Sequence, residues 1–589
     1  MVKRWRIHSH DPDRIAVLQR EAGIPAVAAQ LLICRGISDP LSAKRFLDPK
    51  LSHLRDPEQL PGCSQAAERI HQAIRDGRRI VIYGDYDVDG MTGTALLRQC
   101  IKMLGGNVGY YVPHRIDEGY GLNHEAIRSL AAEKAELIVT VDCGIASVEE
   151  AITAKECGLE LIVTDHHEPN HRLPEAAAIV HPALPGHSYP FQGLSGAGVA
   201  LKLAWALCQQ ASGASKVGQK MKDFLFQAVG LAALGTVADV VPLVDENRVL
   251  VRHGLERSLR ECPPLGLKTL IGVAKLDTGG ELGSEDIAFS LAPRLNAAGR
   301  LEQAQLAIEL LLTDQPDRAR ELATYIDGLN QNRQKLERSI YLAAHKQAKE
   351  QFDPTNDAAL VLADRGWHPG VIGIVAGRLA EKYHRPVVIV SWDRLGVKPG
   401  SGSARSVPGF DLHAALSACD EHLLSHGGHA AAAGLRIKEE KLESFRADFC
   451  EYASSELTHE QRTAELHVDA EFPLGAFTLK VVGQIEQLAP FGHGNARPLL
   501  AASGVTMAEP PRVIGSGGQH LSMRLKQHDI TLRAVAFGGG EWGDELAALD
   551  RPIDIAFRPV INTFRGRRNV ELHLVDWRKA ANEGAVAHQ

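Results

Sequence analysis

The chain has 589 residues, which is more than one hydrophobic core usually supports, so several domains are expected. Hydrophobic residues make up 44% and charged residues 23%, as in ordinary globular proteins, and no uninterrupted apolar run reaches the ~20 residues of a membrane span. The net charge is −7, from 65 basic and 72 acidic residues. This excludes a protein that coats duplex DNA indiscriminately, and any nucleic-acid surface must be locally basic.

The nine cysteines are scattered and include no C-x-x-C pair. This usage is typical of a reducing compartment and excludes a disulfide framework or a zinc ribbon. The basic residues that follow Met1 are not succeeded by an apolar segment, so a secretory signal is not expected. The composition therefore predicts a cytoplasmic protein that does not associate with membranes.

Residues 1 to about 60 have a helical pattern. From residue 79 to about 182, β-rich runs alternate with helical patterns, which predicts βαβ units and a parallel sheet. The expected strands are 79–83, 108–112, 137–141, 160–164 and 177–181, and two of the expected helices are 92–104 and 147–156.

Residues 196–312 are mostly helical in pattern, and the polar segment 316–350 predicts one extended helix that joins two lobes. A second, smaller α/β block follows, with strands expected at 358–363 and 386–391. From about 464, short β-like runs separated by Gly and Pro turns predict a small β-barrel or sandwich. The predicted fold class is therefore α/β and multidomain, with a C-terminal β domain.

Three groups of polar side chains follow three of the expected parallel strands. In open α/β sheets, ligands bind outside the carboxyl ends of the strands, so these groups are expected to converge. Carboxylates and imidazoles without thiolates suit Mn²⁺ or Mg²⁺ better than structural zinc. The groups are Asp85, Asp87 and Asp89, then Asp142, then Asp165, His166 and His167.

Each group alone has a plainer interpretation. A lone Asp after a strand is usually a helix cap or a turn residue, the pair Asp89-Gly90 is a turn signal, and two adjacent histidines commonly lie in a polar loop. Capping alone does not readily account for three such strand ends in one sheet. The combination favours a metal-dependent phosphoesterase.

These motifs resemble those of the DHH phosphoesterase superfamily, and longer motifs downstream resemble its RecJ family of 5′→3′ single-strand DNA exonucleases. The superfamily motifs are Tyr83-Gly84-Asp85-Tyr86-Asp87-Val88-Asp89-Gly90, Val141-Asp142-Cys143-Gly144, Thr164-Asp165-His166-His167-Glu168 and Gly235-Thr236-Val237-Ala238-Asp239. The RecJ-like motifs begin at Pro293, Trp367, Gly427 and Pro490, and the resemblance covers about residues 60 to 577.

The resemblance implies a division into an N-terminal helical segment, a DHH catalytic domain, a connecting helix, a DHHA1 domain, an OB-fold-like DNA-binding domain and a tail. The expected boundaries are 1–60, 61–315, 316–352, 353–456, 457–578 and 579–589. It also implies two divalent ions, Mn²⁺ or Mg²⁺, held by Asp87, Asp89, Asp142, His166 and Asp239. Asp142 would bridge them and His167 would lie beside the reacting phosphate, which makes these two the expected catalytic residues. Relatives often have His at the position of Tyr83, so the resemblance leaves open whether Asp85 or water completes one metal site.

The DHHA1-like block contains Gly402-Ser403-Ala404-Arg405-Ser406, where the family usually has Gly in place of Ala404. By the resemblance, Ser403 and Arg405 would bind a terminal 5′-phosphate; from composition alone the segment is a flexible turn. Further substrate-binding candidates are Arg115, Arg294, Asn296 and His429, although the arginines could equally form surface salt bridges and His429 could be a packing residue.

In the C-terminal domain, Arg558 and the segment from Phe564 to Arg568 supply local positive charge, which suits either a single-strand groove or a solvated hairpin. The aromatic side chains Phe557, Phe564 and Trp577 are either base-stacking platforms or core residues. By the resemblance, the partners would be single-stranded DNA, a single-strand-binding protein and a recombination helicase, and the protein would be a monomer.

Two other functions remain open. The same metal site could serve a small substrate, as in oligoribonucleases with nucleotide phosphatase activity or cyclic-dinucleotide phosphodiesterases, but these relatives generally lack the third domain. A DNA-binding scaffold with a decayed site is disfavoured because the expected metal-binding and catalytic side chains are present. The resemblance thus implies a single-strand-specific 5′→3′ exonuclease of DNA repair and recombination.

Overall fold

The computed structural model describes residues 3–580 apart from 115–117, 215, 277–281, 354–355, 394–395, 459 and 516. The chain divides into two compact units. Unit 1 contains Leu54–Val241 and Val249–Ala464. Unit 2 contains Lys3–His53, Pro242–Arg248 and the described residues from Glu465 onward.

The first sheet of unit 1 has five parallel strands in the order β3-β2-β4-β5-β6. Its central strands are short apolar runs whose side chains are almost all buried, as expected when both faces are covered. The five predicted strands are all confirmed, within one residue at each end. They are β2 (Arg79–Gly84), β3 (Asn107–Tyr111), β4 (Leu137–Val141), β5 (Glu160–Thr164) and β6 (Ala178–Val180).

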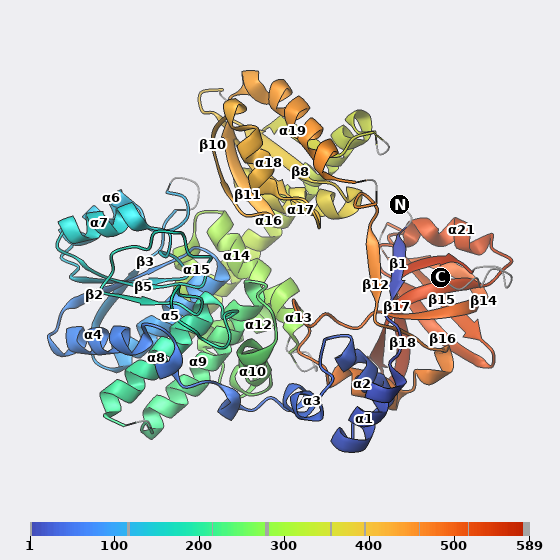
Figure 1. Cartoon of the computed structure of the whole chain (residues 1–589), viewed down its shortest axis with the longest axis horizontal. Coiled ribbons are helices and arrows are strands. Elements are labelled where there is room, and N and C mark those ends of the chain that lie inside the picture. Colours follow the sequence, from blue (N-terminus) through green and yellow to red (C-terminus); the bar gives the residue numbers. More distant parts are fainter. Residues whose placement is uncertain are drawn as a thin grey trace. The chain divides into compact units, whose positions relative to one another are not determined.

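Helices cover both faces of this sheet (Figure 1). On one face α5 and α8 pack on the strands and on α4 and α9; on the other, α6 and α7 bury Ile127 and Ala154 against Val81 and Tyr83. The covering helices are α4 (Cys63–Arg75), α5 (Val88–Met103), α6 (His124–Ala132), α7 (Val148–Glu156), α8 (Gly196–Ser212) and α9 (Gln219–Ala238). Helix α9 is apolar and long enough to span a membrane, but core helices of soluble proteins often are too, and 56% of its most apolar window is buried in the fold.

Residues 245–312 are mostly helical, as predicted. The elements are α10 (Asp245–His253), the π-helical turn η3 (Gly254–Ser258), α11 (Leu259–Glu261), α12 (Leu265–Val273), α13 (Ser284–Asp286), the π-helical turn η4 (Ile287–Leu291), α14 (Ala292–Arg300) and α15 (Ala304–Leu312).

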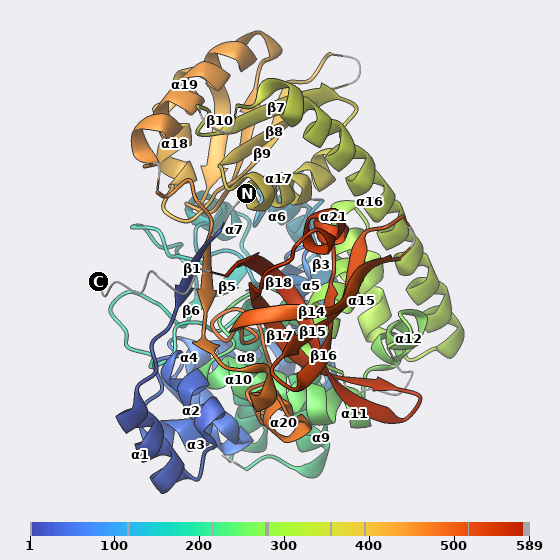
Figure 2. The same cartoon turned by 90° about the vertical axis from the view of Figure 1, so that its right-hand side faces the viewer.

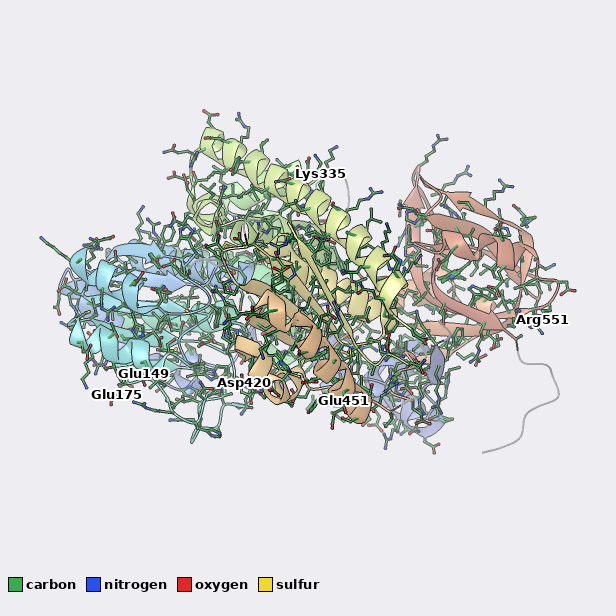
Figure 3. The ribbon with its side chains drawn as sticks, turned by 90° about the horizontal axis from the view of Figure 1, so that it is seen from above. Glu149, Glu175, Lys335, Asp420, Glu451 and Arg551 are labelled. Carbon is green, nitrogen blue, oxygen red and sulfur yellow. The ribbon has the colours of Figure 1, made fainter. Side chains whose placement is uncertain are left out.

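The predicted extended helix is α16 (Pro316–Gln351), 36 residues long. Its buried positions include Ala319, Leu322, Ala323 and Ile326, which recur at the three- and four-residue spacing of one helix face. Figure 2 shows it running from α12 toward β7 and α17, and Figure 3 shows Lys335 on its exposed side.

The second sheet of unit 1 has the order β10-β11-β9-β8-β7. Its elements are β7 (Leu360–Arg365), α17 (Pro369–Tyr383), β8 (Val387–Trp392), β9 (Gly400–Arg405), α18 (Leu412–Ala418), β10 (Leu423–Gly428), β11 (Ala432–Ile437) and α19 (Leu442–Glu456). The interpretation of residues 402–406 as a flexible turn is wrong for most of the segment. Strand β9 is paired on both sides, with β8 and β11, and this pairing overrides the weak strand preference of Gly and Ser.

Unit 2 contains a closed barrel in which β14, β15, β16, β18 and β17 pair in turn and β17 pairs back with β14. This is the predicted β-barrel. Its elements are β12 (Glu465–Val468), β13 (Ala470–Glu471), α20 (Leu479–Glu486), β14 (Leu500–Ile514), β15 (His520–Gln527), β16 (Ile530–Ala536), α21 (Gly543–Ala547), β17 (Ile553–Phe564) and β18 (Arg567–Lys579).

The N-terminal segment packs with this barrel. It contains β1 (Arg4–Ile7), which pairs with β12, and α1 (Pro12–Ala22), α2 (Ala26–Ile33) and α3 (Pro40–Leu47). Leu18, Leu31 and Leu32 share one buried cluster with barrel residues such as Phe557. The strand and this long-range packing were not predicted from the helical pattern.

Unit 2 also holds the short segment Pro242–Arg248. Arg248 is buried, and its guanidinium donates hydrogen bonds to the carbonyl oxygens of Phe46, Leu488 and Ala489. The backbone N–H of Leu243 donates to the carbonyl oxygen of His493 at 2.7 Å. The Pro490–Asn495 region therefore helps to hold the segment Pro242–Arg248.

Candidate metal centre

The loop between β2 and α5 places the first carboxylates. Asp87 caps α5, accepting hydrogen bonds from the backbone N–H groups of Asp89 (2.9 Å) and Gly90 (3.1 Å). The carboxylate of Asp89 is buried and accepts from the backbone N–H of Gly196 (2.5 Å) and Ala197 (3.0 Å), at the N-terminus of α8. A helix N-terminus favours negative charge, so α8 fixes Asp89 and stabilises its ionised form.

Two strand ends and one helix end converge beside Asp89. His166 Nε2 lies 3.0 Å from Asp142 Oδ1, 3.5 Å from Asp239 Oδ2 and 3.9 Å from Asp89 Oδ2. Asp239 is the C-cap of α9, and Asp142 follows β4 with a positive φ of 64°. These four side chains therefore meet at the carboxyl edge of the sheet, as predicted.

A second group of carboxylates also includes Asp142. One oxygen each of Asp85, Asp87 and Asp142 lie within 4.8 Å of one another. The hydroxyl of Tyr83 is engaged elsewhere, donating to the carbonyl oxygen of Gly121 (3.1 Å) and accepting from Asn123 (3.1 Å). Asp142 thus belongs to both ligand groups, as a bridging ligand would, and Asp85 is near enough to contribute to the second.

These side chains fit divalent cations. Among the described residues, Asp142 Oδ1, Asp239 Oδ2 and His166 Nε2 are buried atoms without a hydrogen-bond partner. Burial, and then the charge of Asp89, raises the pKa of Asp142 well above its usual range and that of Asp239 to about 9. Burial and the neighbouring Asp87 raise the pKa of Asp89 to about 7. Without added positive charge the cluster cannot hold all its carboxylates ionised, and two divalent ions would supply that charge.

Asp165 and His167 form a separate pair beside the ligands. Asp165 Oδ1 lies 2.7 Å from His167 Nδ1. Burial lowers the pKa of His167, but the hydrogen bond and charge of Asp165 outweigh it, so the pKa is raised above its usual value. The Tyr120 hydroxyl donates to the backbone carbonyl of Asp142 (2.9 Å) and lies 3.0 Å from His167 Nδ1. His167 is therefore oriented and can hold a proton.

Helix α14 supports the metal-binding loop. Asn296 Oδ1 accepts a hydrogen bond from the backbone N–H of Val88 at 3.1 Å. At Gly299, a Cβ atom would collide with the carbonyl oxygen of Tyr86. The Arg294 guanidinium is ion-paired with Asp327 at 2.8 Å and also donates to the carbonyl of Ser290. The contact between Asn296 and Val88 indicates that Asn296 positions the metal-binding loop. Arg115, another predicted substrate-binding residue, lies outside the described residues.

Ser403 and Arg405 lie next to each other on β9. Arg405 Nη1 donates to Ser403 Oγ (3.2 Å) and to the carbonyl of Ala404 (2.8 Å). A Cβ atom at Gly373 of α17 would lie 2.8 Å from Ser403 Oγ and 3.0 Å from Arg405 Nη2, so a larger residue there would displace these two side chains. His429 is exposed where the β10–β11 hairpin turns. The side chains of Ser403 and Arg405 are therefore in direct contact.

The barrel carries a groove of about 590 Å³ on its outer surface. Arg512, Arg524 and Arg533 line it, and Glu571 forms an ion pair with Arg533 at 2.9 Å. Phe557 is fully buried in the barrel core, so its alternative interpretation as a stacking platform is wrong. Phe537, which sequence reasoning missed, is 61% exposed beside His520 and His573.

Sequence reasoning also missed the residues that hold the ligands. Gly196 and Ala197 bind Asp89 through their backbone, and a Cβ atom at position 196 would lie 2.5 Å from Asp142 Oδ1. The buried His181 lies with Nε2 2.8 Å from the carbonyl oxygen of His167. The closely spaced glycines 193, 196 and 198 were the available signal for a tight approach at α8.

Three domain families match parts of this chain. Residues 79–236 match the DHH family, N-terminal domain; residues 356–455 match the DHHA1 domain; and residues 468–576 match the RecJ OB domain. The Bacillus subtilis single-stranded-DNA-specific exonuclease RecJ is 40% identical over 575 residues, covering 97% of this chain and 70% of that protein.

Two crystal structures from Thermus thermophilus also match. RecJ in complex with Mn²⁺ has a TM-score of 0.82 and 33% identity, covering 98% of this chain and 80% of the other. RecJ in complex with Mg²⁺ has a TM-score of 0.77 and 32% identity, covering 98% and 79%. With this identity over nearly the whole chain, the protein belongs to the RecJ family.

Proposed function

We propose that this protein is a metal-dependent, single-strand-specific 5′→3′ exodeoxyribonuclease that releases 5′-mononucleotides and acts in DNA repair and recombination. The observation that carries the proposal is that carboxylate oxygens of Asp89, Asp142 and Asp239 lie within 4 Å of Nε2 of His166, with buried ligand atoms that form no hydrogen bond. Membership of the RecJ family supports the substrate class.

Two ions, Mn²⁺ or Mg²⁺, would be held by Asp87, Asp89, Asp142, His166 and Asp239, with Asp85 adjacent to one of them. Bound there, they would lower the pKa of the attacking water and offset charge on the entering and leaving oxygens of an in-line displacement. Asp142, which belongs to both ligand groups, would contribute ligand atoms to both.

The chain's own residues supply orientation and proton transfer. Asp165 holds Nδ1 of His167, which leaves Nε2 of His167 to face the reacting phosphate and to hold or release a proton there. The N-terminus of α8 fixes Asp89, and Asn296 fixes the loop that carries Asp87 and Asp89. No side-chain nucleophile is required.

Polarity would come from capture of the 5′ end. Ser403 and Arg405 form a donor pair on β9 that suits a terminal phosphate. A phosphate held at a fixed distance from the ions would restrict cutting to the end of the strand. Arg115, Arg294 and His429 are proposed as further contacts, and Arg294 would have to share its guanidinium with Asp327.

The barrel would bind the rest of the strand. Its groove is lined by Arg512, Arg524 and Arg533, which are ion-paired with Glu509 and Glu571 and would exchange these carboxylates for the phosphates of a single strand. Within this proposal, residues 61–315 are the catalytic domain, 316–352 the connecting helix, 353–456 the DHHA1 domain and 457–578 the DNA-binding domain. Localisation in the cytoplasm, a monomeric state and association with a single-strand-binding protein and a recombination helicase belong to the same proposal.

A time course on 5′- and 3′-labelled oligonucleotides with Mn²⁺ or Mg²⁺ tests the function. We expect labelled mononucleotide to appear first from the 5′-labelled strand, little cutting of duplex, and no activity in Asp142→Ala. Glu133→Gln, which removes an exposed carboxylate of the same domain, is the matched control and should be active. Early release from the 3′ end, or an active Asp142→Ala, would contradict the proposal.

A further inference from the structure

Helix α14 contacts both the metal-binding loop and helix α17, and all three belong to unit 1. Toward the loop, Asn296 bonds the backbone N–H of Val88, and a Cβ atom at Gly299 would collide with the loop backbone. At the end of α14, Arg300 Nη1 donates to the carbonyl oxygen of Gly370 in α17 at 3.2 Å. The C-terminal half of α14 therefore connects the metal-binding loop to the first turn of α17.

The approach between the ends of α14 and α17 is close. A Cβ atom at Gly370 would lie 2.5 Å from the backbone carbonyl oxygen of Arg300, about 1 Å less than an ordinary van der Waals separation. The backbone of Gly370 is also held within its own helix, because its N–H donates to Nδ1 of His368, the N-cap of α17, at 3.1 Å. Any residue larger than glycine at position 370 would therefore force the two helix ends apart.

The same face of α17 contacts the proposed end-binding pair on β9. Gly370, Gly373 and Gly377 recur at intervals of three and four residues, so they lie on one face of the helix. A Cβ atom at Gly373 would crowd the side chains of Ser403 and Arg405, and one at Gly377 would lie 3.8 Å from Arg405 Cγ. Three residues of α17, a rise of about 4.5 Å, separate the contact with α14 from the contact with this pair.

Helix α16 packs on both α14 and α17. Arg294 of α14 is ion-paired with Asp327 of α16 at 2.8 Å. Arg378 of α17 is ion-paired with Glu337 of α16 at 2.9 Å, and its guanidinium lies 4.1 Å over the ring of Tyr341. Because each helix is already fixed to α16, the direct contact between α14 and α17 closes a triangle and leaves little freedom in their spacing.

We propose that the contact between Arg300 and Gly370 positions the Ser403–Arg405 pair at a set distance from the metal centre. The inference rests on the proposed function, because it requires this pair to hold the 5′ end while the metal centre cuts. A misplacement of about 1 Å in a reacting group can slow a reaction by about 100-fold. The contact therefore acts on the rate of cutting, whereas the affinities for the ions and for the strand depend on other residues.

Gly370→Ala in the full-length protein tests this proposal. We expect kcat on a 5′-phosphorylated oligonucleotide to fall about 10- to 100-fold, because the added Cβ atom displaces α17 from α14. On the same oligonucleotide with a 5′-hydroxyl end, which offers the pair no terminal phosphate, kcat should stay within about twofold. The Kd of the phosphorylated oligonucleotide, measured by fluorescence anisotropy without metal, and the Mn²⁺ affinity, measured by calorimetric titration, should be unchanged.

Two further variants keep the test decisive. Gly328→Ala is the matched control, because it also adds a Cβ atom to a helical glycine, in α16, where no other heavy atom lies within 4 Å of it, and every readout should equal that of the wild type. Arg300→Met removes the hydrogen bond to Gly370 and adds no atom at the contact, so it serves if Gly370→Ala does not fold. Its kcat on the phosphorylated oligonucleotide should fall about 5-fold, with both affinities unchanged.

A wild-type kcat in folded Gly370→Ala, or in Arg300→Met where Gly370→Ala does not fold, overturns the proposal. Weaker Mn²⁺ binding, or an equal loss on the 5′-hydroxyl oligonucleotide, also overturns it, because the change would then act through the metal-binding loop. A raised Kd with a normal kcat overturns it as well, because the contact would then shape the end-binding pair itself. If the wild-type protein fails to cut 5′-phosphorylated single strands, the proposed function fails instead.

Discussion

Asp165 and His167 form a hydrogen-bonded pair, with 2.7 Å between Oδ1 and Nδ1. The same carboxylate oxygen accepts the backbone N–H of His166 (2.7 Å) and of His167 (3.1 Å), and its second oxygen accepts from Ile145 (2.9 Å). Asp165 therefore shapes the loop that presents both histidines without facing the metal ligands itself. The strand-end pattern grouped it with the histidines, and the structure assigns it a supporting role.

Asp165→Asn should lower kcat by about 10- to 100-fold, the usual cost of losing an outer carboxylate partner of a metal-site histidine. The amide keeps the size of the side chain but presents Nδ1 of His167 with a weaker acceptor. The His167 ring should therefore be less well oriented and less readily protonated. Steady-state kinetics on an end-labelled oligonucleotide measure the loss. Unchanged kcat with normal Mn²⁺ affinity would show that His167 needs no such partner.

Removal of the metal should destabilise the protein, because the buried carboxyl groups would then be either ionised and mutually repelling or protonated far above their ordinary pKa, and both states cost free energy. Asp239→Asn removes one of these carboxyl groups, so the metal-free variant should melt above the metal-free wild type, by roughly 2–4 °C for each kcal/mol gained. Mn²⁺ should raise the melting temperature of the wild type more than that of the variant. Calorimetric scans with EDTA and with Mn²⁺ measure these melting temperatures. Equal melting temperatures for the metal-free wild type and the metal-free variant would contradict a destabilising effect of the buried carboxyl groups.

Much of the catalytic sheet was predictable, because its strands are short apolar runs and the ligands follow where each strand ends. The roles of Gly196 and Ala197 were not, because Asp89 lies 107 residues before Gly196 and only the packed position of α8 brings them together. The same holds for Asn296, whose partner Val88 lies 208 residues away. Motif spacing reports local chemistry, whereas backbone donors at a distant helix end leave little trace in the sequence.

Strand β9 is a segment whose composition predicts the wrong local structure. Its residues Gly400–Arg405 contain glycine and serine in a pattern typical of a turn, yet β8 and β11 supply hydrogen-bond partners along both edges. Residue preference for strands is weak beside such pairing. The pairing of Ser403 with Arg405 depends on this strand, because alternate residues point to the same face.

Asn296→Ala should separate positioning from substrate binding. Because Asn296 bonds the N–H of Val88 in the metal-binding loop, its loss should weaken Mn²⁺ affinity and lower kcat by about 10-fold, with KM for DNA little changed. Calorimetric titration with Mn²⁺ and steady-state kinetics give the two readouts. A raised KM with normal Mn²⁺ affinity would instead support the predicted role in substrate binding.

Arg405→Ala should reduce the preference for 5′-phosphate over 5′-hydroxyl ends. Loss of a charge-assisted bond to a phosphate costs about 1.5–3 kcal/mol, or roughly 10- to 100-fold in kcat/KM for the phosphorylated strand, with the hydroxyl strand less affected. Arg436→Ala, an exposed arginine on the neighbouring strand β11, is the control and should keep the preference. An unchanged ratio in Arg405→Ala would remove this residue from end recognition.

Arg248→Met should destabilise unit 2 by about 3 kcal/mol or more, because it leaves the carbonyls of Phe46, Leu488 and Ala489 without their buried charged donor. The guanidinium also lies 3.7 Å over the ring of Phe46, so packing is lost together with hydrogen bonds. Hydrogen exchange should rise in residues 486–495 and in α3, where the acceptors lie. Arg551→Met, an exposed arginine of the same unit (Figure 3), should leave exchange within error of the wild type. If both variants behave alike, other contacts hold the segment Pro242–Arg248, and Arg248 contributes no more to stability than an exposed arginine does.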